Sequence, residues 1–278
     1  MTAAVEAWVR NHLGARATIG EPLVGGVTSQ VRRVDAHDRS FVLKQVTNAR
    51  WLAERPDVVG YEAKVLEMLG TDTSLPVPEV VAVDATGAEA GDPSMLITHI
   101  DAAPAGSLDR PDDVLEPLAE TAVAIGEVEP PSWVRPFVRY LDASEASPPL
   151  WTTVEPVWER AIDALAGAAP DTEPRFIHRD YHHWNVLWHD EVVGIVDWSQ
   201  TSIGPASMDI AHCRMNLATQ FGVGAADRFR DAWQERTGLR HHPYFDIVTV
   251  VDLLPDWRPR DRENRILDDY LTGLVGEL

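Results

Sequence analysis

The chain has 278 residues, of which 45% are hydrophobic and 24% charged, so it can bury a core of its own without disulfide bonds. This length suits one large domain or two lobes that share a cleft. The net charge of -20 at pH 7 would repel nucleic acid and anionic membranes, so we expect neither as a partner. The sequence shows no signal-peptide pattern and no apolar stretch long enough for a membrane span. Together with a single cysteine, these features predict a cytoplasmic protein.

The acidic excess is spread unevenly along the chain. Residues 1–99 carry 13 acidic and 9 basic side chains, and residues 100–278 carry 31 and 15, so their net charges are -4 and -16. A cationic ligand bound by the second part would suit this balance. A biased genome composition is the alternative, because only two of the 24 basic residues are lysine. Both interpretations stay open.

The first third of the chain predicts a small sheet with one main helix. Alternating hydrophobic residues indicate strands, whereas apolar residues spaced by three or four indicate helices. The expected strands lie at 31–46, in two parts around a polar turn at 36–39, at 75–87 and at 94–100. The expected helices lie at 1–15 and 57–70.

From about residue 102 the pattern becomes mainly helical, apart from short strand-like runs in 176–198. The expected helices lie at 112–127, 154–168, 207–221, 224–237 and 261–275. Pro104 and Gly106 interrupt the pattern between the two parts and indicate a linker. We therefore predict an α+β protein of two lobes. Its parts would be a nucleotide-binding lobe at 1–99, a hinge at 100–107, and a helical lobe with the catalytic loop and acceptor site at 108–278.

The most informative motif lies in the sequence FIHRDYHHWNVLWHDEVVGIVDW, which covers residues 176–198. Asp180 ends a His-Arg-Asp triplet, Asn185 follows five positions later, and Asp197 follows an apolar run. Phosphoryl transfer needs a carboxylate that orients the acceptor hydroxyl and takes its proton, and two oxygen ligands for Mg²⁺. Asp180 can serve as the base, and Asn185 and Asp197 as the metal ligands. Taken singly, Asp180 and Asn185 could also be ordinary turn or cap residues.

A β-hairpin is expected within this motif. Two short apolar runs, VLW and VVGIV, flank a polar turn at 189–191. Asp197 shares its strand face with Val193 and Ile195, so an apolar strand would deliver it to the edge of a cleft. The hairpin would also bring Asn185 near Asp197, as two ligands of one metal ion must be.

Two charged side chains on apolar faces give an independent indication. Lys44 shares its strand face with Val42 and Val46, and Glu62 is surrounded by apolar residues on its helix. Neither can be buried without a partner, so we expect them to pair, with the Lys44 amine also contacting nucleotide phosphates. The alternatives are a purely structural ion pair, or a Lys44 side chain that extends to water.

A third, weaker pattern is the sequence VGGVTSQ at 24–30. Gly25 and Gly26 could let backbone amides approach a phosphate group, with the Ser29 hydroxyl as a further donor. An ordinary hairpin turn explains two adjacent glycines equally well.

Together, these residues resemble the aminoglycoside phosphotransferase and choline kinase-like family, which has a protein-kinase-like fold. The matching residues are Gly25-Gly26, Lys44, Glu62, HRDYHHWN at 178–185, IVDW at 195–198 and GPASMDIAH at 204–212. The resemblance implies ATP or GTP as co-substrate and Mg²⁺ as cofactor. It implies Asp180 as catalytic base, Asn185 and Asp197 as magnesium ligands, and Lys44 on the phosphates. It also implies backbone bonds from Thr98 and Ile100 to the nucleotide base.

The chain also departs from the family pattern. Arg179 stands where the family often has glycine, and the bulky Trp184 precedes Asn185, so the acceptor of a relative cannot simply be transferred. Asp209 matches a family aspartate that braces the catalytic loop. An N-cap of the helix expected at 207–221 is the alternative interpretation of Asp209.

We therefore predict a small-molecule kinase that transfers the γ-phosphate of ATP or GTP to a hydroxyl group. The acceptor would be small and could be cationic, as an aminoglycoside or amino-sugar is. After Asp197 and Trp198, only SQTSIGPA precedes the next helix, which favours a small acceptor over a protein. One alternative is a non-catalytic nucleotide-binding protein of the same fold. Another is a zinc-dependent hydrolase whose ligands would be His178, Asp180, His182 and His183.

Overall fold

The computed structural model describes residues 2–23, 29–255 and 261–278, and only the backbone of Asp261. The chain divides into two compact units. The first unit comprises Met1–Ala103 and Leu187–Gln200, and the second unit comprises Pro104–Val186 and Thr201–Leu278. The stretch that carries Asp197 therefore belongs with the N-terminal part of the chain, although it lies far along the sequence.

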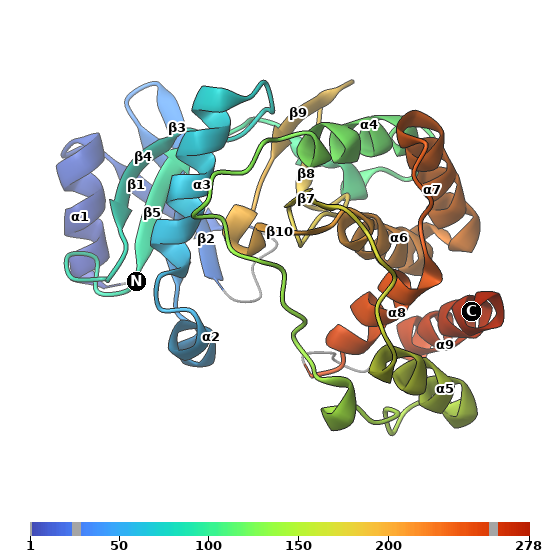
Figure 1. The fold of residues 1–278 in the computed structure, drawn as a ribbon. Helices are drawn as coiled ribbons and strands as arrows, with labels where there is room; N and C mark the ends of the chain where they lie inside the picture. The colour runs from blue at the N-terminus through green and yellow to red at the C-terminus, as the bar shows by residue number, and fades with distance from the viewer. Residues whose placement is uncertain (1, 24–28, 256–260) are drawn as a thin grey trace. The chain divides into compact units, whose positions relative to one another are not determined.

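The first unit is built on a five-stranded antiparallel sheet with the strand order β1-β2-β3-β5-β4 (Figure 1). The strands are β1 (Thr18–Pro22), β2 (Ser29–Ala36), β3 (Arg39–Val46), β4 (Val80–Asp84) and β5 (Ser94–Thr98). β2 and β3 pair from Ser29 opposite Val46 to Ala36 opposite Arg39, so the two strands and the turn expected there are confirmed.

The helices α1 (Ala3–Leu13) and α3 (Val58–Asp72) pack against opposite faces of this sheet (Figure 1). The short helix α2 (Ala49–Glu54) has no buried residue. The apolar side of α1 shares one hydrophobic core with Phe41 and Leu43 of β3. Because side chains alternate along a strand, Lys44 points to the other face, where α3 lies against β4 and β5.

The expected hairpin is present. β8 (Val186–Trp188) and β9 (Val192–Ile195) are neighbours in a small sheet, and the His189 amide donates a hydrogen bond of 3.0 Å to the Glu191 carbonyl in the turn. The Ile195 amide donates to the Pro76 carbonyl, which ties β9 to the chain before β4. The short helix η3 (Trp198–Gln200) follows and lies against α3.

The second unit is mainly helical, and α6 is its central helix. The helices are α4 (Leu115–Gly126), α5 (Glu155–Ala166), α6 (Ser207–Phe221), α7 (Val223–Thr237), α8 (Pro243–Asp252) and α9 (Asp261–Glu277). Shorter elements are β6 (Ala103–Pro104), η1 (Ala105–Ser107), η2 (Ala143–Glu145), β7 (Pro174–Ile177) and β10 (Ser202–Pro205). α6 packs against α7, α8 and α9, and β7 pairs antiparallel with β10 (Figure 1).

The five helices expected in the second unit are confirmed, whereas α8 was not expected. Every residue of α8 after Pro243 is buried, including the polar Asp246, Thr249 and Asp252. In the described ranges, no helix has both the length and the apolar character needed to cross a membrane.

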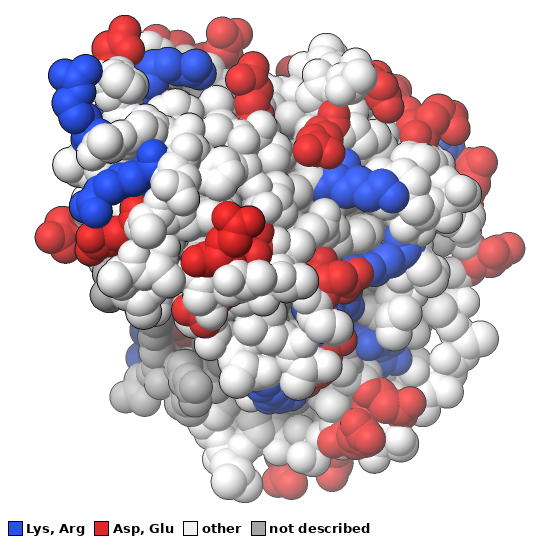
Figure 2. Space-filling model, turned by 90° about the vertical axis from the view of Figure 1, so that its left-hand side faces the viewer, with Lys and Arg blue, Asp and Glu red and all other residues white. Residues whose placement is uncertain are grey.

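The acidic residues do not all lie at the surface. On the face shown in Figure 2, acidic and basic side chains are interspersed rather than gathered into one acidic patch. In the second unit, Asp246, Asp252 and Asp268 are buried and accept hydrogen bonds within the protein. Some of the acidic residues that give residues 100–278 their net charge of -16 therefore accept hydrogen bonds in the protein interior.

Asp268 is the clearest of these internal acceptors. It is 3% exposed, and its Oδ1 accepts hydrogen bonds from the Thr152 hydroxyl at 2.7 Å and the Trp158 indole N–H at 2.8 Å. Its Oδ2 accepts from the amide and hydroxyl of Thr153. Burial raises the pKa of Asp268, but the hydrogen bonds from these three residues outweigh it and hold the pKa below its ordinary value.

We predict that Asp268→Ala lowers the free energy of unfolding by about 3 kcal/mol, because buried donors of α5 and the segment before it lose their acceptor. Urea unfolding at pH 7 would measure the loss. The exposed neighbour variant Asp269→Ala should change the same quantity by less than about 0.5 kcal/mol.

The sign of the pH dependence follows from the lowered pKa. The contribution of Asp268 is present above the unfolded pKa of about 4 and is lost as the pH falls through the lower folded pKa. The stability difference between wild type and Asp268→Ala should therefore shrink below about pH 4. A difference that stays constant down to the acid transition would contradict this.

Candidate active site

The centre of the first unit is a buried ammonium group shared by two carboxylates. Lys44 is 7% exposed, and its Nζ donates to both carboxylate oxygens of Glu62, at 2.8 and 2.7 Å. It also donates to Oδ1 of Asp197 at 2.7 Å, across 153 residues of sequence. The pair expected between Lys44 and Glu62 is therefore present, and Asp197 joins it. A Lys44 side chain that extends to water is excluded.

Glu62 faces inward as its helical neighbours indicate. The apolar residues on the same face of the helix, up to one turn before and two turns after Glu62, are buried; they are Val58, Val59, Val65, Leu66 and Leu69. Glu62 itself is 2% exposed. α3 therefore carries one acid on a fully apolar face, directly opposite the lysine of β3.

The backbone of Asp197 has an unusual conformation, which orients its carboxylate. It follows β9 and has a φ of +67°, a left-handed conformation that costs a residue with a side chain about 1 kcal/mol. Its Oδ1 also accepts a hydrogen bond from the Ser199 hydroxyl at 2.9 Å. The next side chain, Trp198, is fully buried and its indole N–H donates to the Ile195 carbonyl. The buried tryptophan anchors the bend that turns the Asp197 carboxylate to Lys44.

The electrostatics of this cluster favour the charged lysine. Burial lowers the pKa of Lys44, but the adjacent carboxylates of Asp197 and Glu62 outweigh it, and the pKa is raised above its ordinary value. Burial raises the pKa of Glu62, and the Lys44 ammonium is the main opposing influence. With both acids ionised the cluster carries one net negative charge. The Asp197 side chain is 33% exposed and remains within reach of a ligand.

The other residues expected to contact a nucleotide are placed as follows. Ser29 begins β2 opposite Val46 and is 7% exposed. The Thr98 amide donates to the Glu79 carbonyl, and the Ile100 carbonyl accepts from the Ala102 amide, so these two backbone groups already have partners within the protein. Gly25 and Gly26 lie outside the described residues.

In the second unit, the loop between β7 and β8 is held by a buried aspartate of α6. The Asp209 carboxylate accepts hydrogen bonds from the backbone amides of His178 at 2.8 Å and Arg179 at 2.7 Å. Burial raises the pKa of Asp209 to about 7, against the opposing effect of these two bonds. The N-cap interpretation of Asp209 is wrong, because α6 begins at Ser207 and its N-cap is Ala206.

Arg179 fastens the same loop to a second place. Its φ is +74°, where glycine would be unstrained, yet the side chain is buried and its Nη2 lies 3.1 Å from Oδ2 of Asp252. The guanidinium lies over the rings of Phe137 and Tyr140, at 4.5 and 4.3 Å from their centres. Asp252 also accepts from the amides of Tyr140 and Leu141, so Arg179 connects the loop to both α8 and the segment at 137–141.

Asp180 and Asn185 meet within this loop. The Asn185 side-chain amide donates to the Asp180 carbonyl oxygen at 2.9 Å and to its carboxylate Oδ2 at 3.2 Å. Two oxygen acceptors fix the orientation of the Asn185 amide, so its own oxygen points away from Asp180. The Asp180 side chain is 32% exposed and therefore accessible from solvent.

Two histidines flank the Asp180 carboxylate. Nε2 of His212 lies 3.2 Å from Oδ1 of Asp180, and Nε2 of His182 lies 3.6 Å from the same oxygen. Burial lowers the pKa of His212 well below its ordinary value, so this ring is neutral at pH 7. His212 was not expected at this site, although it lies three positions after Asp209 and therefore on the same side of α6.

The neighbouring residues of the loop have other surroundings. Nε2 of His183 pairs with the side-chain oxygen of Gln220 at 2.9 Å, and burial lowers the pKa of His183 to about 4. His178 stacks edge-on against Tyr181. The ligand set of His178, Asp180, His182 and His183 expected for a zinc hydrolase is therefore not assembled. Trp184 is 44% exposed and lies against Gly106, where a Cβ atom would come within 2.5 Å of the indole.

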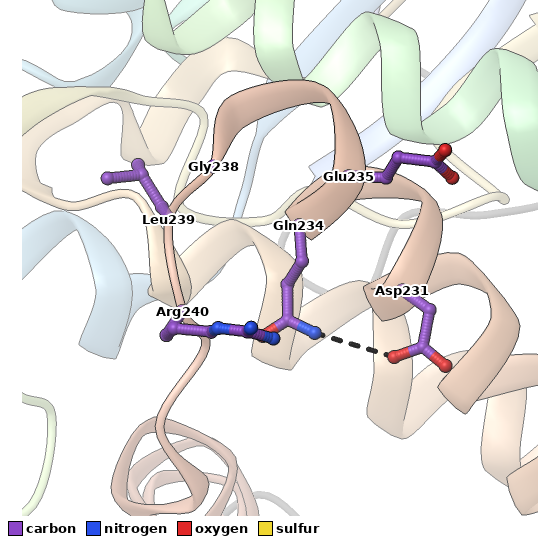
Figure 3. A pocket seen from close by; sticks show the side chains of 6 residues that line it. All are labelled: Asp231, Gln234, Glu235, Gly238, Leu239 and Arg240. Carbon is purple, nitrogen blue, oxygen red and sulfur yellow. Dashed lines mark hydrogen bonds between the residues drawn. The ribbon is translucent and has the colours of Figure 1, made fainter.

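A separate depression lies at the end of α7 (Figure 3). It has a volume of about 300 Å³ and is lined by Asp231, Gln234, Glu235, Gly238, Leu239 and Arg240. Its Gln234 side chain already donates to Asp231 at 3.4 Å (Figure 3). No residue of the loop at 178–185 lines it, so it is distinct from the candidate active site.

Comparisons with known proteins identify the family of the chain. Residues 19–244 match the profile of the phosphotransferase enzyme family, APH. The match covers most of the chain, including every expected site residue. A comparison of the sequence with curated proteins gives no match.

Several solved structures share the fold at low sequence identity. A thermostable mutant of aminoglycoside phosphotransferase APH(4)-Ia, in a ternary complex with ADP and hygromycin B, has a TM-score of 0.68 and 16% identity, covering 99% of this chain and 97% of that one. The microcompartment-associated aminopropanol kinase has a TM-score of 0.69 and 15% identity, with coverages of 99% and 95%. Macrolide 2'-phosphotransferase MphH from Brachybacterium faecium has a TM-score of 0.62 and 14% identity, with coverages of 98% and 98%. The expected α+β, kinase-like fold is confirmed.

We predict that Arg179→Gly lowers the free energy of unfolding by about 2 kcal/mol. Glycine relieves the strain at φ +74° but leaves the buried Asp252 carboxylate without its cation, and the second effect is larger. Urea unfolding of wild type, Arg179→Gly, Asp252→Asn and the double variant would measure the coupling between the two residues. Additive losses would show that the ion pair contributes nothing, and an unchanged or more stable Arg179→Gly would contradict the prediction.

Proposed function

Because the chain belongs to the phosphotransferase enzyme family, we propose that it transfers the γ-phosphate of ATP or GTP to a hydroxyl group of a small molecule. One observation carries this proposal. Lys44, Glu62 and Asp197 come from three distant parts of the sequence and converge on a single buried ammonium group. A purely structural ion pair would need one acid, and the second acid is one-third exposed, which supports a role in binding a ligand.

In the first unit, Lys44 would contact the phosphates of the nucleotide. Glu62 holds the ammonium in place from the buried side, and Asp197 would bind the Mg²⁺ that accompanies the phosphates. The donors fit this ion, because carboxylate and amide oxygens are the hard ligands that magnesium prefers. When bound, the metal neutralises charge that develops on the transferred group. Ser29, Gly25 and Gly26 would line the phosphates, and Thr98 and Ile100 the base.

In the second unit, Asp180 would accept the proton of the attacking hydroxyl. Its carboxylate is accessible, and its loop is fixed by Asp209 from α6 and by Arg179. Asn185 would be the second magnesium ligand, because its amide nitrogen is engaged by Asp180 and its oxygen is directed elsewhere. A base held rigidly can orient the acceptor as well as deprotonate it. The first unit, Met1–Ala103 with Leu187–Gln200, would then bind the nucleotide, and the second unit would bind the acceptor. The lobes expected from the sequence at 1–99 and 108–278 would be corrected by the stretch with Asp197, and 100–107 stays the proposed hinge.

For the acceptor we propose an alcohol that also carries an amine. Two of the structurally similar proteins act, by their names, on amino compounds, an aminoglycoside and aminopropanol. The net charge of -16 in residues 100–278 favours a cation, although Asp252 and Asp268 are engaged internally and reduce the number of acids that could contact it.

We predict that Asp180→Asn lowers turnover by about 10²–10⁴-fold while nucleotide affinity stays within about twofold of wild type. The substitution removes the proton acceptor and keeps the shape of the side chain. Release of ADP in the presence of an accepted alcohol and direct titration with a nucleotide analogue would measure the two quantities. Equal turnover by both proteins would remove Asp180 from the role of base, and nucleotide binding without turnover in either would indicate a non-catalytic protein.

The acceptor class can be tested with matched pairs. Each amino alcohol or aminoglycoside would be compared with an analogue whose amine is acetylated, in an assay that couples ADP or GDP release to a colour change. We expect kcat/KM to fall by at least about tenfold when the positive charge is removed, because a charged pair in a cleft is worth more than 1.4 kcal/mol. Equal rates for both members of every pair would contradict a cationic acceptor.

A further inference from the structure

The two histidines beside Asp180 have no part in the phosphoryl transfer proposed above. We infer that Asp180, His182 and His212 form a binding site for Zn²⁺, and that zinc bound there inhibits the enzyme. The inhibitory part rests on the proposed role of Asp180 as base, whereas zinc binding does not.

The geometry of the three side chains suits a small, tightly coordinated cation. One ligand atom from each residue lies within 4.8 Å of the other two. Oδ1 of Asp180 is 3.2 Å from Nε2 of His212 and 3.6 Å from Nε2 of His182. Tetrahedral zinc with bonds of about 2.0–2.1 Å needs ligand atoms roughly 3.3 Å apart, so the observed spacings lie on either side of the ideal value. Within the described part of the chain, this is the one such group of three.

The donor atoms distinguish this site from the magnesium site. Two imidazole nitrogens and one carboxylate oxygen suit Zn²⁺, whereas Mg²⁺ prefers oxygen ligands only. The zinc ligands would come from a loop and from α6, and they share no residue with the proposed magnesium ligands Asn185 and Asp197. A competition experiment with Zn²⁺ and Mg²⁺ in solution can therefore distinguish the zinc site from the magnesium site.

The site is rigid on one side and open on the other. The rings of His182 and His212 are stacked with their centres 5.4 Å apart and their planes at 24°, and His212 is fixed in the middle of α6. The three side chains remain 32%, 16% and 20% exposed for Asp180, His182 and His212. A cation can therefore enter from solvent, and water can complete its coordination as in other zinc sites with three protein ligands.

Binding would displace the contacts that both ring nitrogens of His182 make. Nε2 lies 3.2 Å from Nδ2 of Asn185, and Nδ1 accepts from the Trp184 amide at 3.2 Å. When Nε2 binds a cation the ring proton lies on Nδ1, so both contacts are lost. The Asn185 amide keeps its two oxygen acceptors on Asp180. The Trp184 amide lies at an exposed position and can bond to water instead, so the cost is small beside the formation of three metal bonds.

Zinc at this place would block the chemistry of Asp180 directly. An electron pair of Oδ1 would be bound to the metal, and the carboxylate charge would be neutralised. Asp180 could then neither orient the acceptor hydroxyl nor take its proton. Inhibition by zinc would persist in excess Mg²⁺, because the two ions prefer different donor atoms.

Zinc titration by calorimetry, with Mg²⁺ in excess, tests the binding. We expect one Zn²⁺ per chain for wild type, and at least about tenfold weaker binding for His182→Leu and for His212→Leu. His189→Leu is the matched control, because His189 is exposed in the turn between β8 and β9 and should leave the affinity unchanged. Circular dichroism would show that each variant is folded. Absence of the wild-type site, or equal losses in His189→Leu, would overturn the inference.

Two further measurements keep the test decisive. In the wild-type protein, Co²⁺ in place of Zn²⁺ should give the intense visible absorption of a four-coordinate site. This measurement does not depend on the folding of any variant. Absence of the absorption would overturn the inference. In the turnover assay, one equivalent of Zn²⁺ should abolish phosphoryl transfer, and a zinc-selective chelator should restore it. Zinc binding with unchanged turnover would overturn the inhibitory part. Absence of turnover with and without zinc would instead count against the proposed function.

Discussion

The structure of the first unit depends on the buried ammonium group of Lys44. An uncompensated charge in this position would cost several kcal/mol, so β3 can carry a lysine on an apolar face only if acids are brought to it. Glu62 arrives on α3 and Asp197 arrives on the chain after β9. One charged group therefore fixes a strand, a helix and a segment 153 residues away, and it sets the strained backbone of Asp197 in place.

In the second unit, buried carboxylates provide the partners for a buried cation and for buried backbone amides. Asp209 holds two backbone amides of the loop at 178–185, and Asp252 holds Arg179 together with two amides of the segment at 137–141. Each carboxylate replaces solvent for donors that would otherwise be buried without an acceptor. The acidic composition of residues 100–278 is therefore partly a requirement of this loop.

The adjacent histidines His182 and His183 of the loop lie in different environments. His183 is directed into the second unit, where burial lowers its pKa and Gln220 is its partner. His182 is directed to the Asp180 carboxylate and stacks on His212 of α6. The same carboxylate would thus serve as base for an acceptor hydroxyl and as ligand for zinc. Occupancy by the metal excludes the first role, which would make activity dependent on free zinc.

The sequence by itself determined the elements whose side chains follow a period. The strands β2 and β3, the hairpin of β8 and β9, and the inward face of α3 with Glu62 could be predicted because the pattern repeats every two or every three to four residues. Only the tertiary structure decided that Asp197 joins Lys44, that Asp252 binds Arg179 and that His212 reaches Asp180. These partners lie 32 to 153 residues apart in the chain. A local sequence period gives no information on which distant charged residue will pair with a buried charged residue.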